Sequence, residues 1–171
     1  MITVESSSSE ATRAFGIALA GVLQPGDIVL LSGDLGAGKT TLVQGVAAAL
    51  GVTEPVTSPT FTLMRTYVGA PGGVLIAHVD VWRLEHLQEV RDLGLDELLD
   101  DGAIALIEWG EAIVPVLGRD AAAVRIAAGS TDDARTISVE PLGRGAAPRV
   151  ELLADRLAEG SGRAGAGVGG R

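Results

Sequence analysis

The only lysine of this chain, Lys39, lies in the segment Gly-Asp-Leu-Gly-Ala-Gly-Lys-Thr at residues 33–40. This G-x-x-x-x-G-K-[ST] spacing is typical of a loop that cradles nucleotide phosphates, because its glycines let backbone N–H groups approach an anion closely. A lysine ammonium is a compact charge that can bridge oxygens of adjacent phosphates, whereas an arginine presents a wide planar fork. The expected phosphate-binding residues are Gly33, Asp34, Leu35, Gly36, Ala37, Gly38, Lys39, Thr40 and Thr41.

Two apolar segments of the chain, residues 74–80 and 103–108, end in the carboxylates Asp80 and Glu108. Ligands of open α/β sheets bind at the carboxyl ends of the strands, where both acids are expected. Magnesium takes a few carboxylate or hydroxyl oxygens and keeps several waters, so Thr40 with one of the two acids would hold it. The other acid would orient an attacking water. Taken alone, either acid could equally be a solvated residue at a strand end.

Three further positions could contribute to such a site. Thr60 follows Pro59 in a hydroxyl-rich segment that proline should keep extended, and a threonine there could sense a terminal phosphate through its metal. An ordinary loop explains the same composition. Strand alternation puts His78 on the same face as Asp80 and predicts a hydrogen bond that orients this carboxylate. For Arg83, catalysis, core packing and partner contact are all open.

The elements around the loop favour a phosphate site over an ordinary glycine turn. Residues 27–32 form a short apolar, β-branched run typical of a buried parallel strand. Residues 40–50 have helix-forming composition and end at Gly51. Strand, loop and helix therefore follow in the required order, and the helix N-terminus adds partial positive charge beside the phosphates.

The rest of the chain alternates between strand and helix patterns. We predict strands at 2–4, 61–68, 74–79, 103–107, 122–127 and 136–139, and helices from residue 9 or 10 to 23, at 84–99 with a break at Gly94, at 111–117 and at 149–158. The sum is an α/β, P-loop NTPase-like three-layer fold with a mostly parallel central sheet and flanking helices. We expect one domain over residues 1–159 and a flexible Gly/Ala/Arg-rich tail over residues 160–171.

Composition excludes several classes of function. A net charge of -9 and a pI near 4.6 argue against a free-standing nucleic-acid binder, which needs clustered cations. The absence of cysteine excludes disulfides and thiolate metal sites and is compatible with a reducing cytosol. No secretory signal is visible in the first residues, and apolar runs stop well short of the ~20 residues that span a bilayer. We expect a cytoplasmic protein with no membrane contact.

Four motifs in order resemble the TsaE (YjeE) family: residues 33–41, Ser-Pro-Thr-Phe at 58–61, His-Val-Asp-Val-Trp-Arg at 78–83 and Glu-Trp-Gly-Glu at 108–111. The similarity spans roughly residues 9–140. One departure is Trp82, where the family commonly has tyrosine. The resemblance implies a magnesium-dependent P-loop ATPase of tRNA N6-threonylcarbamoyladenosine (t6A37) biosynthesis, which drives turnover of a TsaB–TsaD complex. It also implies low intrinsic activity, stimulation by TsaD and TsaB, and contact with tRNA only through that complex.

The same resemblance implies a role for individual residues. Lys39 and Thr40 would hold phosphate and Mg²⁺, Glu108 would be the metal-associated acid, and Asp80 would be required for hydrolysis. Thr60 would act as a switch. The residues implied in nucleotide contacts beyond the loop are Trp109, Thr12 and Arg135.

Two alternative functions remain open at this stage. A small-molecule P-loop kinase would need an acceptor pocket and usually an arginine-bearing lid, and the sequence has no compact arginine cluster of that kind. A GTP-dependent switch protein would need an N-K-x-D element to read guanine. With Lys39 as the only lysine, this chain cannot contain one.

Overall fold

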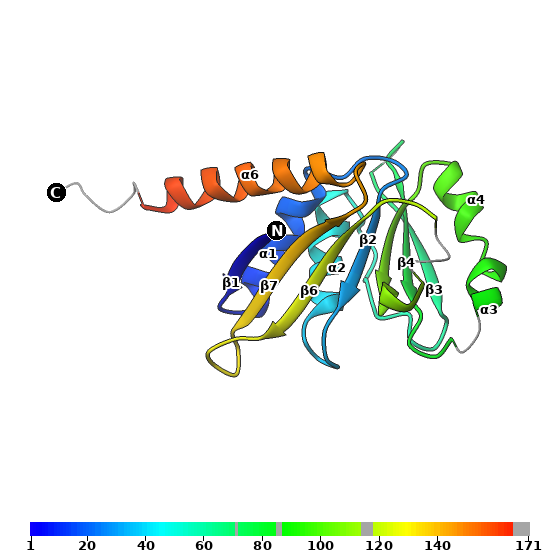
Figure 1. Cartoon of the computed structure of the whole chain (residues 1–171), viewed down its shortest axis with the longest axis horizontal. Coiled ribbons are helices and arrows are strands. Elements are labelled where there is room, and N and C mark those ends of the chain that lie inside the picture. Colours follow the sequence, from blue (N-terminus) through cyan, green and yellow to red (C-terminus); the bar gives the residue numbers. More distant parts are fainter. Residues whose placement is uncertain (71, 85–86, 114–117, 166–171) are drawn as a thin grey trace.

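A seven-stranded sheet with the order β1-β7-β6-β2-β5-β4-β3 forms the centre of the computed structural model (Figure 1). The structure describes all residues except 71, 85–86, 114–117 and 166–171. The strands are β1 Ile2–Ser6, β2 Ile28–Ser32, β3 Met64–Val68, β4 Leu75–Asp80, β5 Ile104–Glu108, β6 Ala121–Ala128 and β7 Arg135–Leu142. The helices are α1 Ser9–Ala20, α2 Lys39–Ala49, α3 Leu87–Asp92, α4 Leu95–Asp100, the 3₁₀ helix η1 Gly110–Ile113 and α6 Ala147–Gly165.

The four central strands of the sheet run parallel. β2 pairs in parallel with both β5 and β6, and β4 pairs in parallel with β5. The outer pairings, β3 with β4, β7 with β6 and β1 with β7, are antiparallel. Continuous apolar sequence in β2 and β5 fits this position, since a central parallel strand is covered on both faces. The predicted α/β fold with a mostly parallel sheet is confirmed.

Alternate residues of the central strands pack into two separate apolar layers, one on each face of the sheet. Val29 and Leu31 of β2 pack with buried residues of α1, α2 and α6, whereas Ile28 and Leu30 pack with buried residues of α4 and η1. This division follows from the two-residue period of a strand, which points successive side chains to opposite faces. The sheet therefore lies between two helical layers, as predicted for a three-layer fold.

Helices α1 and α2 approach each other through a pair of buried glycines. A Cβ atom on Gly45 would lie 2.1 Å from the carbonyl oxygen of Arg13, and one on Gly16 would lie 2.3 Å from that of Leu42. The two backbones therefore touch where neither residue has a side chain. This contact fixes α2, which carries the glycine-rich loop at its N-terminus.

Several predicted boundaries differ from the observed ones. β3 begins at Met64 rather than at residue 61, because a turn precedes it in which the N–H of Leu63 donates to the carbonyl of Pro59 at 2.7 Å. The predicted helix 84–99 is two helices, and Gly94 between them adopts a left-handed φ of 70°. Of the predicted helix 111–117, the structure describes only η1; residues 114–117 lie outside the described residues.

The predicted end of the last helix at residue 158 is wrong. α6 runs to Gly165 and thus includes residues 160–165, which were assigned to the flexible tail (Figure 1). Its first turns are anchored by the buried Val150 and Leu153, and the strong helix formers Ala158 and Glu159 extend it. Residues 166–171 lie outside the described residues, and the domain boundary at 159 stays a prediction.

No helix in the described part of the chain combines the length and the apolar character that crossing a bilayer requires.

The glycine contact between α1 and α2 yields a test of the fold. We expect Gly45→Ala to lower the free energy of unfolding by about 1–3 kcal/mol, because the added methyl group overpacks the helix crossing. Helix propensity alone predicts the opposite sign, since alanine is favoured over glycine by about 1 kcal/mol. Gly160→Ala in α6 is the matched control, because nothing lies within 4 Å of an added Cβ there. Urea unfolding in which both variants equal the parent would contradict the prediction.

Candidate functional site

The glycine-rich loop lies between the carboxyl end of β2 and the first residue of α2. Gly33, Gly36 and Gly38 have φ angles of 137°, 78° and 111°, a region that residues with a Cβ rarely adopt. A Cβ on Gly33 would also lie 2.2 Å from the carbonyl oxygen of Ile126 in the neighbouring β6. The glycines are thus required by the backbone path itself. The predicted strand, loop and helix occur in the predicted order.

Lys39 is buried beneath this loop, with 5% of its surface exposed. Its Nζ donates to the carbonyl oxygens of Gly33 at 2.8 Å and Asp34 at 3.1 Å and lies 4.1 Å from the centre of the Trp109 ring. Burial lowers the pKa of the ammonium, and the nearby carboxylates, Glu108 first among them, oppose that shift. The loop therefore holds a partly desolvated ammonium against two neutral carbonyl oxygens. An anionic phosphate could replace these oxygens as the acceptor.

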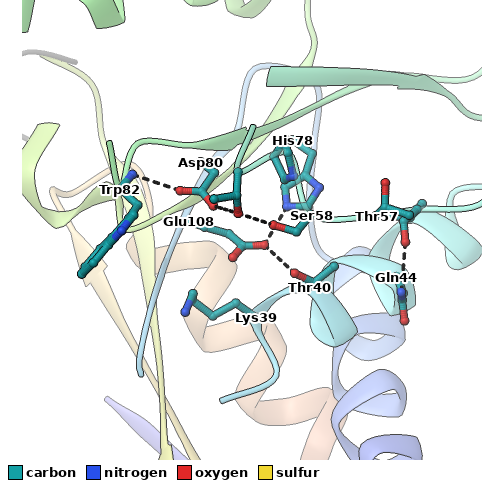
Figure 2. A network of polar contacts seen from close by, with 12 residues as sticks. Lys39, Thr40, Gln44, Thr57, Ser58, His78, Asp80, Trp82 and Glu108 are labelled. Carbon is teal, nitrogen blue, oxygen red and sulfur yellow. Dashed lines mark hydrogen bonds and ion pairs between the residues drawn. The ribbon is translucent and has the colours of Figure 1, made fainter. Parts of the chain in front are cut away.

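Two side chains from two other elements meet at one oxygen of Glu108 (Figure 2). Oε1 of Glu108 accepts a hydrogen bond from Oγ1 of Thr40 at 2.9 Å and lies 2.9 Å from Nε2 of His78. A carboxylate only accepts, so Nε2 is the protonated ring nitrogen. Glu108 and His78 are both buried. Among the described residues nothing donates to Oε2, which leaves this oxygen and the lone pairs of the Thr40 hydroxyl available to a cation.

The predicted hydrogen bond between His78 and Asp80 is therefore wrong. His78 and Asp80 do lie on one strand two residues apart, but the imidazole bonds to the carboxylate of the next strand, β5. The register sets Asp80 opposite Glu108 and His78 opposite Leu106. The longer glutamate side chain reaches back from position 108 to the histidine. Sequence alternation gives the face of a residue, but not which neighbouring strand supplies its partner.

Asp80 has a separate set of partners. Its Oδ2 accepts the Thr60 hydroxyl at 2.6 Å, and its Oδ1 accepts the backbone N–H of Trp82 at 3.0 Å (Figure 2). The Thr60 and Ser58 hydroxyls are 2.7 Å apart. The structure thus brings the predicted switch residue Thr60 onto the second acid, although the two are 20 positions apart in the sequence.

The hydroxyl-rich segment is tied to α2 and β3 at its start. The side-chain amide of Gln44 donates to the carbonyl of Val56 at 3.0 Å, and the backbone N–H of Thr57 donates to the Tyr67 hydroxyl at 3.3 Å. Arg13 of α1 in turn donates to the Gln44 side chain at 3.2 Å. These anchors hold the segment so that Thr60 faces the site.

A cavity of about 620 Å³ opens over these groups. Trp82 and Trp109 form one wall, with ring centres 4.4 Å apart. Trp109 has a φ of 62°, which is rare for a residue with a side chain, and its ring covers Lys39. The residues that line the cavity are Asp34, Leu35, Gly36, Gly38, Lys39, Thr40, Thr41, Ser58, Thr60, Asp80, Trp82, Arg83, Glu108 and Trp109.

A second cavity of about 320 Å³ lies on the other side of the loop and is lined by Thr12 and Arg135 among others. It shares Gly36, Gly38 and Thr41 with the first cavity. Nε of Arg135 donates to the carbonyl of Ala37 at 3.1 Å, so the arginine also braces the loop. Thr12 is buried, and its hydroxyl bonds with Ser6 and Ser8. The fold thus places both residues beside the loop, and their contact with a nucleotide stays a prediction.

The arrangement of acids limits what metal the site could hold. Within the described part of the chain, no three His, Cys, Asp or Glu side chains cluster as a metal cage. One carboxylate oxygen beside one hydroxyl fits magnesium, which usually binds through one or two carboxylates together with substrate phosphates and waters. The pair Thr40 and Glu108 meets that requirement.

Two features of the site were not predicted from the sequence. One is the contact of Lys39 with Trp109 and through it with Trp82. The other is the placement of Arg83 over the ring of Phe61 at 4.8 Å. Four of the five aromatic residues lie in or beside the motifs, which was the sequence signal for aromatic side chains in the site. This signal did not indicate which ring would contact which cation.

Comparison with known proteins gives consistent similarities. A family model described as "Threonylcarbamoyl adenosine biosynthesis protein TsaE" matches residues 6–137. The TsaE protein of Streptomyces coelicolor is 46% identical over 147 residues, which cover 83% of this chain and 99% of that protein. The TsaE protein of Bacillus subtilis is 40% identical over 149 residues, 86% and 88% of the two chains. The crystal structure of YdiB from B. subtilis aligns with a TM-score of 0.73 at 31% identity, over 94% of this chain and 95% of that one.

The contact between His78 and Glu108 yields a test of the site's geometry. We expect His78→Leu to lower the free energy of unfolding by about 1–3 kcal/mol, because the buried Glu108 loses a hydrogen-bond donor. His78→Gln should recover much of this loss, since its terminal amide can donate from a position similar to Nε2. Urea unfolding measures both. Equal stability of the leucine and glutamine variants would show that the hydrogen bond does not hold the carboxylate.

Proposed function

The chain belongs to the TsaE family of threonylcarbamoyl adenosine biosynthesis proteins, and from that premise we propose that it is a magnesium-dependent ATPase in tRNA t6A37 biosynthesis. One observation carries the proposal. A single cavity joins the buried Lys39 ammonium, held in a glycine-rich loop, to the hydrogen-bonded pair Thr40 and Glu108. Cation, hydroxyl and acid are the three groups that a P-loop needs to hold a nucleotide triphosphate with its metal.

In this proposal the loop and Lys39 bind the phosphates. The N-terminus of α2 and the backbone N–H groups of the loop supply partial positive charge and donors. Lys39 exchanges the carbonyls of Gly33 and Asp34 for phosphate oxygens, which are stronger acceptors because they are charged. Desolvation lowers the pKa of Lys39, and the arriving negative charge would oppose that shift.

Thr40 and Glu108 would hold Mg²⁺, through the threonine hydroxyl oxygen and the free Oε2. The ion, when bound, neutralises charge on the transferring phosphoryl group. His78 fixes the rotamer of Glu108 by donating to Oε1, so that Oε2 would stay free for the ion. The Thr40 hydroxyl donates its proton to the same Oε1 and keeps its lone pairs for the ion.

Asp80 would orient the water that attacks the γ-phosphate in line, yielding ADP and inorganic phosphate. Its carboxylate now accepts the Thr60 hydroxyl, and release of this hydrogen bond would leave that oxygen wholly to the water. Thr60 is then free to interact with the metal or the terminal phosphate, as expected of a switch residue. Trp109 stays close to the phosphates, and the smaller cavity with Thr12 and Arg135 takes the ribose or the base.

TsaD and TsaB homologues are the proposed partners, and tRNA is met only through their complex, in the cytoplasm. Two apolar side chains at the larger cavity support protein docking there, since Leu35 and Trp82 are 95% and 59% exposed. The net charge of -9 disfavours direct tRNA binding. Isolated turnover should be slow, because Thr60 competes with the attacking water for Asp80 until the segment moves.

Nucleotide binding tests the site assignment. Calorimetry with Mg²⁺ should show ATP binding to the parent protein and weaker binding of GTP. Lys39→Ala should weaken ATP binding by roughly 10- to 100-fold, the loss expected when a charged hydrogen-bond donor is removed. Circular dichroism of the variant serves as the folding control. Absence of a binding heat for ATP with the folded parent protein would sink the proposal.

The reaction itself has a second test. Inorganic phosphate should appear slowly with the isolated protein and faster when TsaB and TsaD are added. Equal rates with and without the partners would contradict the proposed coupling. Appearance of a phosphorylated small molecule in place of free phosphate would instead favour the kinase alternative.

A further inference from the structure

Arg83 follows β4 in a tight turn that is built on Asp80. The carboxylate of Asp80 accepts the backbone N–H of Trp82 at 3.0 Å, and the N–H of Leu84 donates to the carbonyl of Val81 at 3.1 Å. Two hydrogen bonds thus set the backbone at Arg83. Its side chain lines the larger cavity together with Lys39, Asp80 and Glu108.

The guanidinium of Arg83 lies over an aromatic ring. Its central carbon lies 4.8 Å from the centre of the Phe61 ring, and that ring is 85% exposed. In the described ranges no carboxylate forms an ion pair with Arg83. Asp80 is near in sequence, but its carboxylate accepts the Thr60 hydroxyl and the Trp82 N–H. An exposed stack of this kind is weak, so the cation can move to a stronger partner.

The position of the two cavities gives the direction in which a nucleotide would lie. They share Gly36, Gly38 and Thr41 of the loop, and only the larger one contains Thr40, Glu108 and Asp80. The metal and the reacting phosphate therefore belong in the larger cavity, and the nucleoside in the smaller. Arg83 lies on the side of the reacting phosphate, and a guanidinium fork matches phosphate oxygens better than any other side chain.

We propose that Arg83 is a catalytic residue of this chain, which leaves the Phe61 ring to contact the terminal phosphate of the bound nucleotide and stabilises the charge that shifts during its transfer. This inference rests on the proposed ATPase function. It assigns the arginine that many phosphoryl-transfer enzymes use to the chain itself rather than to a partner. Phe61 carries the guanidinium at the cavity until the nucleotide arrives, and it does so from the same segment as Thr60.

The test compares Arg83→Ala and Arg83→Lys with Arg144→Ala. Arg144 is an exposed arginine just after β7. Because β7 runs antiparallel to β6, Arg144 lies at the end of the strands opposite to the loop. Three quantities are measured for each variant: affinity for Mg-ADP, affinity for Mg-ADP with aluminium fluoride as a mimic of the transferring phosphoryl group, and single-turnover ATP hydrolysis with TsaB and TsaD present.

We expect Arg83→Ala to slow hydrolysis by at least about 100-fold and to lose most of the gain in affinity that aluminium fluoride gives, with Mg-ADP affinity nearly unchanged. Arg83→Lys should recover little, since an ammonium lacks the planar fork. Arg144→Ala should behave as the parent protein.

The inference would be overturned if Arg83→Ala hydrolysed ATP at the rate of the parent protein and showed the same gain in Mg-ADP affinity with aluminium fluoride. The ATPase proposal would then remain intact. A parent protein that binds no Mg-ATP would overturn the proposed function itself, and the role of Arg83 with it. A lysine variant that equals the parent protein would show that charge alone suffices and would overturn the assignment of a role to the guanidinium fork.

Discussion

A single buried carboxylate oxygen, Oε1 of Glu108, connects the three elements that form the floor of the site. It joins β5 to α2 through Thr40 and to β4 through His78. An unsatisfied carboxylate at this depth would be costly, so both donors have to stay in place for the fold to tolerate the acid. The same two bonds leave Oε2 as the oxygen free among the described residues. Burial of the acid therefore also determines which atom is available for chemistry.

Acidic side chains surround the buried ammonium of Lys39 in the site. Lys39 is enclosed under its loop, and Asp34, Asp80 and Glu108 oppose the lowering of its pKa that burial causes. Negative charge thus surrounds a positive one in a chain whose net charge is -9. The proposed polyphosphate with its metal ion would suit this arrangement, because the ion would offset the acids and Lys39 would offset the phosphates. The neutral ring of Trp109 shields the ammonium without competing as a charged partner.

Much of this site could be predicted from local sequence. The loop at 33–41 needs a strand before it and a helix after it, and all three are short-range patterns. Asp80 and Glu108 at the carboxyl ends of their strands followed from the same kind of pattern. The prediction that His78 bonds to Asp80 was wrong because it assumed a partner on the same strand. The end of the last helix was missed because residues 160–165 have loop-like composition but continue a helix that is anchored earlier.

The sequence alone determined the glycine-rich loop, the alternation of strands and helices, and the identity of the chemical groups, because each depends on residues close together in the chain. Only the tertiary structure decided which groups meet. The sheet order puts β5 between β2 and β4 and so brings Glu108 to both Thr40 and His78. Folding of distant segments places Arg135 on Ala37 and Arg83 on Phe61. Such pairings depend on strand order and on side-chain reach, which no local pattern encodes.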